Sequence, residues 1–192
     1  MADIKTLMKN PLYVFALQSE AVGHFEHTEP LFVGVGKLNA MYSLMKRITQ
    51  QKPSIIINLG SAGSTTHNRG EVVCCTRFVQ RDMDVTPLGF EKYKTPFSLH
   101  PPVIYYGLEV EGLAQGICGT GDSFVTNHNC DDYDVIDMEA FPLAWVAMQE
   151  EIPFLCLKYI SDGADGAAAT DWPETVKLAA EALRKTVDGI LG

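Results

Sequence analysis

The chain lacks an excess of positive charge. Its 192 residues include 15 Lys and Arg against 24 Asp and Glu, which gives a formal net charge of −9. A protein that binds a nucleic-acid backbone needs clustered basic side chains, so no nucleic-acid partner is expected. The chain also lacks an apolar run long enough to cross a membrane, and Met1–Asn10 lacks the apolar core of a secretory signal. We therefore expect a cytoplasmic protein without a membrane partner.

Cysteine and histidine spacings typical of metal sites are also missing. The five cysteines include no CxxC pair. His24 with His27, and His128 with Cys130, have no third ligand at a zinc-like spacing. An odd number of cysteines, several of them within apolar runs, is typical of buried and reduced thiols. We expect neither a metal nor a cofactor.

The dinucleotide-binding fingerprint is incomplete. Gly34 and Gly36 follow an apolar run and precede a helical pattern, but Asn39 occupies the third glycine position. The next apolar run does not end in an acidic residue, where a carboxylate that binds ribose would lie. The two glycines still allow a backbone to approach a ligand closely.

Short apolar runs alternate with amphipathic helical patterns along the chain. The helical spacing of apolar residues predicts helices that begin near Lys37, Ala140 and Asp171, with Asp171 as the cap of a capping box. This alternation predicts one α/β domain over residues 1–192, with a mostly parallel sheet and helices on both faces. The expected strands are Leu12–Leu17, Leu31–Val35, Ile55–Leu59, Gly70–Phe78, Gly116–Cys118, Val135–Ile136 and Phe154–Ile160.

Polar or small residues directly follow most of these apolar runs. Glu139 and Asp162 come after two consecutive runs, and a carboxylate in such a place is costly to desolvate, so it usually has a partner or a function. The strand ends of an open α/β sheet meet at one edge, where ligands bind. The recurrence predicts one ligand site, built from Glu20, Gly34–Gly36, Gly60–Gly63, Phe124, Glu139 and Asp162.

Each of these residues, taken alone, also has a purely structural interpretation. Glu20 resembles a solvated loop residue, Glu139 a hydrogen-bonded core carboxylate, and Asp162 a cap or turn residue beside Gly163. Met138 could simply fill a gap in the core.

Seven short motifs follow one another along the chain in a characteristic order and spacing. They are Ala16–Glu20, Gly34–Lys37, Asn58–Gly63, Asp84–Thr86, Gly121–Phe124, Asp137–Ala140 and Ile160–Asp165. Together they resemble the purine nucleoside phosphorylase/uridine phosphorylase superfamily, and within it they are most similar to the 5′-methylthioadenosine/S-adenosylhomocysteine nucleosidases. The resemblance implies an α/β fold with a mixed, mostly parallel, partly closed central sheet flanked by helices. It also implies a homodimer that cleaves the N-glycosidic bond of a purine nucleoside.

The resemblance also implies roles for single residues. Asp162, helped by Ser161, would protonate N7 of the leaving adenine, Glu20 would activate the attacking water, and Glu139 would bind the ribose hydroxyls. These residue types suit the reaction, because its transition state resembles an oxocarbenium ion and a purine leaves poorly unless it is protonated. The other implied contacts are Ser61 to the water, Met138 beneath the ribose, Phe124 on the base, the Val125 backbone at the adenine edge, and Trp172 over the 5′ substituent.

The chain departs from the family pattern in the same region. Lys158 stands where the nucleosidases usually have an arginine near the water and the ribose, and Asp137 stands where they have a glutamate. A lysine is a point charge without the planar fork of an arginine, so Lys158 is expected to bind the water with a different geometry. The stretches 21–30 and 64–69 are shorter than usual, which could alter the preference for the 5′ substituent.

The residues that follow the first expected strand favour hydrolysis over phosphorolysis. Phosphorylases of the superfamily carry arginines and a glycine-rich loop for phosphate near the first strand, where this chain has Gln18–Ser19–Glu20. A carboxylate repels phosphate and can act as a base on water. The alternatives are a phosphorylase, a related purine nucleosidase similar to futalosine hydrolase, and a nucleoside-binding protein without turnover.

The long irregular stretch Gln80–Pro102 is typical of a functional loop or a contact with another subunit.

Overall fold

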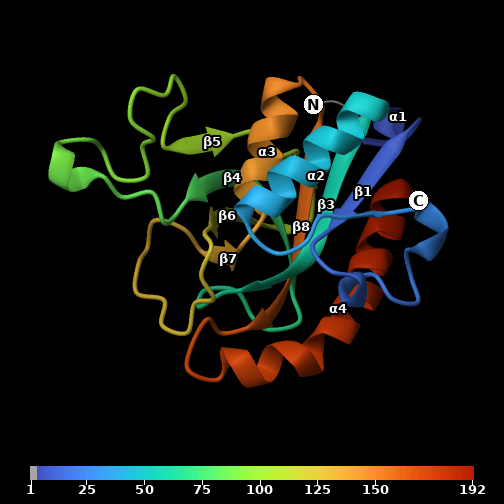
Figure 1. Ribbon diagram of the computed structural model, residues 1–192. Coiled ribbons are helices and arrows are strands. Elements are labelled where there is room, and N and C mark those ends of the chain that lie inside the picture. The colour runs from blue at the N-terminus through green and yellow to red at the C-terminus, as the bar shows by residue number, and fades with distance from the viewer. Residues whose placement is uncertain (1–3) are drawn as a thin grey trace.

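A central sheet with helices on both sides makes up the protein (Figure 1). The computed structural model describes residues 4–192, except for the side chains of residues 169–174 and 177. The strands are β1 (Pro11–Phe15), β2 (Leu31–Phe32), β3 (Ile55–Gly63), β4 (Val72–Gln80), β5 (Val103–Tyr105), β6 (Ala114–Thr120), β7 (Val135–Asp137) and β8 (Phe154–Asp162). The helices are α1 (Ile4–Leu7), α2 (Lys37–Gln50), α3 (Ala140–Gln149) and α4 (Ala168–Leu191), with short 3-10 helices η1 (Gln18–Glu20), η2 (Glu26–Thr28) and η3 (Thr86–Leu88).

The sheet is mixed and partly closed. Its strands follow the order β2–β1–β3–β7–β6–β4–β5, and β8 pairs with both β3 and β4. The strands β3, β8, β4, β6 and β7 therefore form a closed circuit, from which β1 and β2 extend at β3 and β5 extends at β4. Among the described residues the parallel pairings are β1–β2, β1–β3, β3–β8, β4–β6 and β6–β7, and the antiparallel ones are β3–β7, β4–β5 and β4–β8. The predicted mixed, mostly parallel and partly closed sheet is confirmed.

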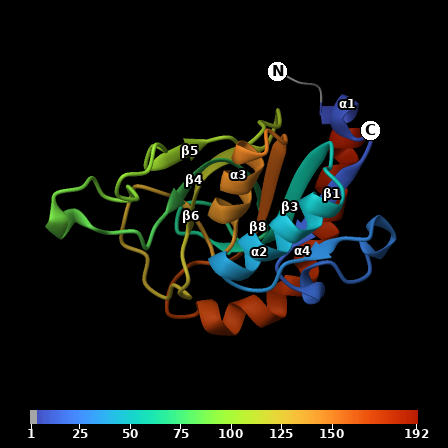
Figure 2. The same cartoon turned by 45° about the horizontal axis from the view of Figure 1, so that its top comes forward.

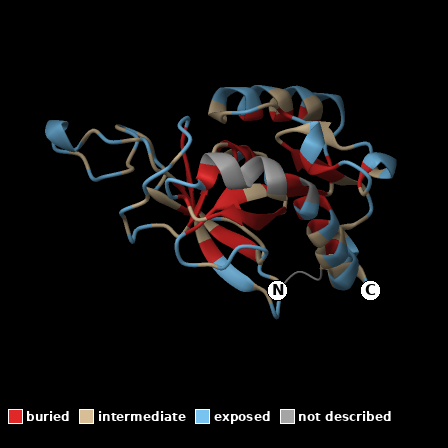
Figure 3. Ribbon diagram, turned by 90° about the horizontal axis from the view of Figure 1, so that it is seen from below, coloured by how far each residue is buried: buried red, intermediate tan, exposed pale blue. Residues whose placement is uncertain are grey.

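Two hydrophobic clusters cover the two faces of the sheet. One includes Leu44 of α2 and Leu143 of α3, and the other includes Leu183 of α4 together with Phe15 and Phe25. Every residue of β8 and nearly every residue of β3 is buried, which is typical of strands that are covered on both faces. Figure 3 shows these buried strands at the centre, with the exposed residues on the outer helices and loops. Within the described part of the chain, no helix is both long and apolar enough to cross a membrane.

Several element boundaries differ from the sequence-based predictions. β3 continues through Gly60–Gly63, because these small residues still pair with β8 across a register shift near its end. β2 is only two residues long. α4 begins at Ala168, so the prediction that Asp171 caps it is wrong. The alanines at 167–169 have a high helix propensity, and the helix starts on them, before Asp171.

The segment between β4 and β5 extends away from the sheet (Figure 2). It contains η3 and exposes large apolar side chains, among them Leu88, Phe97 and Leu99. Few contacts within the chain cover these side chains, so they are exposed to water. The segment therefore offers an apolar surface outside the core of this chain.

Candidate active site

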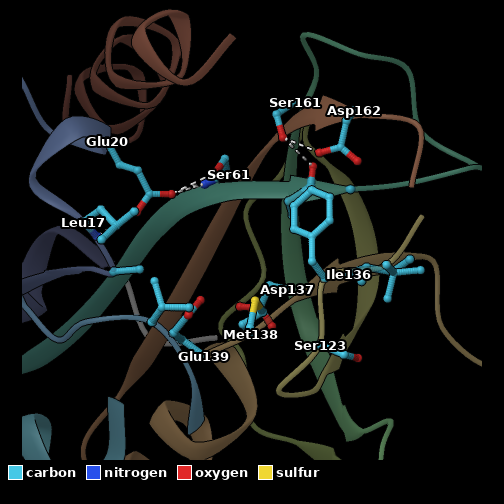
Figure 4. Close-up of a pocket in the computed structure, with 16 residues that line it drawn as sticks. Leu17, Glu20, Ser61, Ser123, Ile136, Asp137, Met138, Glu139, Ser161 and Asp162 are labelled. Carbon is cyan, nitrogen blue, oxygen red and sulfur yellow. Dashed lines mark hydrogen bonds between the residues drawn. The ribbon is translucent and has the colours of Figure 1, made fainter. Parts of the chain in front are cut away.

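A cavity of about 230 Å³ lies at the C-terminal ends of β1, β3, β7 and β8. Figure 4 shows Glu20 with Ser61 on one side, Ser161 with Asp162 on another, and Met138 between them. The structure thus brings the predicted strand-end residues together at one edge of the sheet, as expected for this architecture. The lining residues are Ala16, Leu17, Glu20, Val35, Ser61–Gly63, Ser123–Val125, Ile136–Glu139, Ser161 and Asp162.

Glu20 has a buried carboxylate that three donors hold in place. Its Oε1 accepts hydrogen bonds from the backbone N–H of Ser61 at 2.9 Å and from the Ser61 hydroxyl at 2.8 Å. Its Oε2 accepts one from the backbone N–H of Leu17 at 3.1 Å. A Cβ on Gly60 would lie 3.2 Å from Oε1, so a glycine suits this close approach. Glu20 is therefore a fixed acceptor at the cavity wall and not a solvated loop residue.

Asp162 ends β8 and is also buried. The Ser161 hydroxyl donates to Oδ2 at 2.8 Å, and the backbone N–H of Ala164 donates to Oδ1 at 2.9 Å. A Cβ on Gly63 would lie only 2.7 Å from Oδ1, so this strand end needs glycine beside the carboxyl group. A serine hydroxyl can donate to a carboxylate or accept from a carboxylic acid. Ser161 can therefore serve Asp162 in both protonation states.

Glu139 lies at the start of α3 and lines the cavity from below in the view of Figure 4. Its Oε1 accepts a hydrogen bond from the backbone N–H of Gly36 at 2.9 Å. Burial, followed by the negative charge of Asp137, raises the pKa of Glu139 to about 7, although Lys158 and the Gly36 N–H act in the opposite direction. Glu139 therefore changes charge near neutral pH, and ionised it can accept hydrogen bonds from hydroxyl groups.

Lys158 does not line the cavity, so the expected contact of its side chain with the water or substrate is wrong. Its Nζ lies 2.8 Å from Oδ2 of Asp137, and the two side chains are only 3% and 1% exposed. Although burial favours the neutral amine, Asp137 raises the pKa of Lys158 well above its usual range. Conversely, Lys158 outweighs burial and lowers the pKa of Asp137. Asp137 thus holds the ammonium group of Lys158 in an ion pair behind the cavity wall.

The loop between β6 and β7 forms another wall of the cavity. Phe124 and Val125 line it there, and the Phe124 side chain is 51% exposed. Arg81, the residue directly after β4, supports this loop, because its guanidinium donates to the Ser123 hydroxyl at 3.0 Å, to the Gly121 carbonyl at 3.1 Å and to the Ser123 carbonyl. The arrangement presents an accessible aromatic face at the mouth of the cavity, on which a planar base can stack.

Trp172 lies in α4, and its side chain is outside the described residues. Its expected contact with a 5′ substituent therefore stays a prediction.

Comparison with known proteins connects this geometry to a family. The sequence matches the phosphorylase superfamily over residues 28–192. The chain belongs to this superfamily. It is 31% identical to the 5′-methylthioadenosine/S-adenosylhomocysteine nucleosidase of an Exiguobacterium species, over 76% of this chain and 72% of the relative. It is 30% identical to the enzyme of the same name from Haemophilus influenzae, over 77% of this chain and 73% of the relative.

A solved structure has the same fold as this superfamily member. The Neisseria meningitidis 5′-methylthioadenosine/S-adenosylhomocysteine nucleosidase, in complex with methylthio-immucillin-A, superposes with a TM-score of 0.81 at 24% identity. The superposition covers 96% of this chain and 99% of that chain. The nucleoside phosphorylase-like architecture inferred from the motifs is confirmed.

Two supporting side chains of the site in this superfamily member, Arg81 and Thr120, were not predicted, and neither was the contact that the predicted glycine Gly36 makes with Glu139. Arg81 follows β4 within a polar stretch, and nothing in the sequence indicates that it reaches the loop at Gly121. Thr120 ends β6 and holds Asp137 through its hydroxyl. The Gly36 N–H binds Glu139 from a residue with φ of +94°. A glycine in a strand-to-helix turn was the one available signal, since it permits a close backbone approach.

Proposed function

We propose that this superfamily member hydrolyses the N-glycosidic bond of an adenine nucleoside, with 5′-methylthioadenosine and S-adenosylhomocysteine as the candidate substrates. One observation carries the proposal. Two buried carboxyl groups, Glu20 and Asp162, face one cavity from different sides (Figure 4), and a third, Glu139, lines the same cavity from the start of α3. A hydrolytic nucleosidase needs a base for water and an acid for the leaving purine. The relatives at about 30% identity carry the corresponding name.

The chemistry follows from the positions of these groups. Asp162 gives its proton to N7 of the adenine as the C1′–N9 bond breaks, and the bonding electrons leave with the base. Glu20 accepts a proton from water as the water oxygen bonds to C1′. Glu139 holds the ribose hydroxyls, and in its ionised form it stabilises the positive charge that develops on the sugar. The products are free adenine and the 5-substituted ribose.

The charge of the cavity favours water over phosphate as the nucleophile. Among the described residues that line it there are four carboxylic residues, Glu20, Asp137, Glu139 and Asp162, and neither lysine nor arginine. A phosphate dianion needs cationic or N–H partners to overcome such a field. Hydrolysis therefore does not depend on phosphate.

A product assay separates the two reactions. The enzyme is incubated with 5′-methylthioadenosine, S-adenosylhomocysteine, 5′-deoxyadenosine, adenosine and inosine, with and without phosphate, and the free base and sugar are quantified. We expect adenine and a free 5-substituted ribose at the same rate in both buffers. Strict dependence on phosphate, with formation of a ribose 1-phosphate, would show a phosphorylase instead.

We also infer that the protein acts as a homodimer. The helix α2 exposes Leu38, which is 81% accessible, and Tyr42, and the segment between β4 and β5 exposes Phe97 and Leu99. A second cavity of about 470 Å³ lies against α2 and α3 and is lined in part by Leu38 and Trp145. Exposed apolar patches of this kind mark association surfaces. Light scattering should give twice the chain mass, and L38E should give the mass of one chain. A monomeric wild type would contradict this inference.

The compartment and the metabolic setting follow from the same proposal. The five cysteines are free thiols, and four of them are buried, which suits a reducing cytoplasm. Hydrolysis of 5′-methylthioadenosine would supply adenine and a methylthio sugar for methionine salvage. Alkylation of the unfolded protein without a reductant, followed by mass spectrometry, should find all five cysteines alkylated, and a disulfide would contradict this inference.

A further inference from the structure

The Lys158–Asp137 ion pair is buried directly behind the candidate ribose site. The Nζ and Oδ2 atoms lie 2.8 Å apart, and both side chains are almost entirely inaccessible. Removing two charges from water is costly, and a buried ion pair often contributes less to stability than apolar side chains of the same volume would. The stability of the fold alone therefore gives little reason for a lysine and an aspartate at these positions.

The aspartate of this pair also fixes the backbone that directly follows Glu139. Oδ2 of Asp137 accepts a second hydrogen bond, from the backbone N–H of Ala140, at 2.8 Å. Its Oδ1 accepts one from the Thr120 hydroxyl at 2.5 Å, and the Thr120 oxygen in turn accepts the N–H of Phe141 at 2.9 Å. Asp137 and Thr120 thus hold the first two N–H groups of α3, and Glu139 is the residue directly before them.

We propose that the buried Lys158–Asp137 pair is a positioning element that fixes Glu139 in the cavity and balances its charge. The inference rests on the proposed function, because it takes Glu139 as the group that binds the ribose hydroxyls. It assigns Lys158 a role that differs from a direct contact with water or substrate. The lysine neutralises an aspartate that the start of α3 needs but that would otherwise repel the charge on Glu139.

The charges around Glu139 come from several elements. Among the described residues, the titratable groups that act on it are Asp137 of β7, Lys158 of β8 and Glu20 of η1. The thiols of Cys118 and Cys156 lie near Lys158. Burial raises the pKa of Cys118 to about 12, so this thiol is neutral near pH 7. With Lys158 and Asp137 paired, their net charge is zero. Loss of either partner leaves a single charge next to Glu139.

The two halves of the pair therefore have opposite effects on Glu139. In K158M the unpaired negative charge of Asp137 favours the protonated form of Glu139. In D137N the unpaired positive charge of Lys158 favours its ionised form. An unpaired charge this close typically shifts a pKa by about one unit or more. If the pair had only a structural role, both substitutions would lower stability, and they would not shift the pKa of Glu139 in opposite directions.

The first experiment measures kcat/KM for adenine release against pH in the wild type, K158M, D137N and the double variant D137N/K158M. The acidic limb should move by about one pH unit to higher pH in K158M and to lower pH in D137N. It should return close to the wild-type position in the double variant, which restores neutrality. Equal movement in the same direction in both single variants, or no movement, would overturn the inference. If K158M does not fold, D137N and the double variant still carry the test.

The second experiment reads Glu139 without turnover. The carboxyl carbons of glutamate are labelled with carbon-13, the Glu139 resonance is identified by its loss in E139Q, and its midpoint is followed against pH in the same four proteins. If the wild type releases no adenine but the Glu139 midpoint shifts in opposite directions in K158M and D137N, the proposed function is refuted and the inference stands. Adenine release with a Glu139 midpoint that ignores both substitutions would keep the function and overturn the inference.

Discussion

Ser61 gives both its backbone N–H and its hydroxyl to one oxygen of Glu20, at 2.9 and 2.8 Å. The other oxygen, Oε2, accepts a hydrogen bond from Leu17 and retains a lone pair. That oxygen is therefore the one we expect to take the proton of the attacking water. The two bonds from Ser61 keep the carboxylate from turning away from the cavity.

Removal of the Ser61 hydroxyl should slow the chemical step. A hydrogen bond to a charged group contributes roughly 1.5–3 kcal/mol, so S61A should lower kcat by about tenfold or more with a smaller change in KM. Steady-state kinetics with 5′-methylthioadenosine measures both constants. T186A, which removes a hydroxyl bonded to a carbonyl within α4, is the matched control and should keep wild-type kcat. Equal losses in the two variants would contradict the role of Ser61.

A methyl group at Gly63 should displace the acid. The Cβ of G63A would lie 2.7 Å from Oδ1 of Asp162 and 3.1 Å from the Cβ of Ala164, so Asp162 must shift. A misplacement of about 1 Å can cost roughly 100-fold in rate, and we expect a loss of that order in kcat. G166A is the control, because a Cβ at Gly166 meets no atom within 4 Å. Full activity in G63A would show that the position of Asp162 does not limit the reaction.

Loss of the Arg81 guanidinium should weaken binding of the base. The loop before Phe124 would lose its bonds to Gly121 and Ser123. Hydrogen bonds that involve a charged group contribute roughly 1.5–3 kcal/mol each, so R81M should raise KM about tenfold or more and change kcat less. R184M, which breaks an ion pair with Asp188 on α4, serves as the control. A fall in kcat at constant KM would place the effect of Arg81 elsewhere.

Glu139 should make the stability of the protein depend on pH. Its pKa is about 7 in the folded state, compared with 4.5 for an ordinary glutamate. The folded state therefore binds more protons at Glu139 between these values, and the contribution of this group to stability is greatest below about pH 4.5 and falls as the pH rises to about 7. Glu139→Gln removes this loss. The unfolding free energy of E139Q relative to the wild type should rise by about 3 kcal/mol from pH 4 to pH 8.

Urea unfolding of both proteins at several pH values measures this difference. E181Q, which changes an exposed glutamate of α4, should follow the wild type at every pH. A constant difference between E139Q and the wild type would mean that Glu139 is ionised alike in the folded and unfolded chains.

Much of the fold followed from the sequence because its signals are local. Runs such as Ile55–Ile57 indicate central strands by their β-branched side chains, and the spacing of Leu44 and Ile48 indicates a buried helical face. The closed circuit of strands did not follow from such patterns. It depends on β8 pairing with both β3 and β4, and only the resemblance to a family implied it. The start of α4 was missed because the capping pattern at Asp171 suggested a later start than the alanines permit.

The part of the candidate site that could be predicted consists of carboxylic residues that directly follow apolar runs, because a carboxylate in such a place usually has a function. Glu20, Glu139 and Asp162 line the cavity as expected. Lys158 was misplaced because a sequence does not reveal which carboxylate a buried lysine will pair with, and Asp137 lies 2.8 Å away. The supports from Arg81 and Thr120 were missed for the same reason, since both depend on contacts between distant segments.

The most direct test of the account is adenine release from 5′-methylthioadenosine in phosphate-free buffer, by the wild type, D162N and D165N. Asp162 is buried in the cavity, whereas Asp165 is an exposed residue three positions on that pairs with Arg69. If Asp162 protonates the base, D162N should lose about 10²–10⁴ in kcat and still bind the nucleoside in a calorimeter, and D165N should act like the wild type. Unchanged adenine release in D162N, or no release by the wild type, would contradict the proposed reaction.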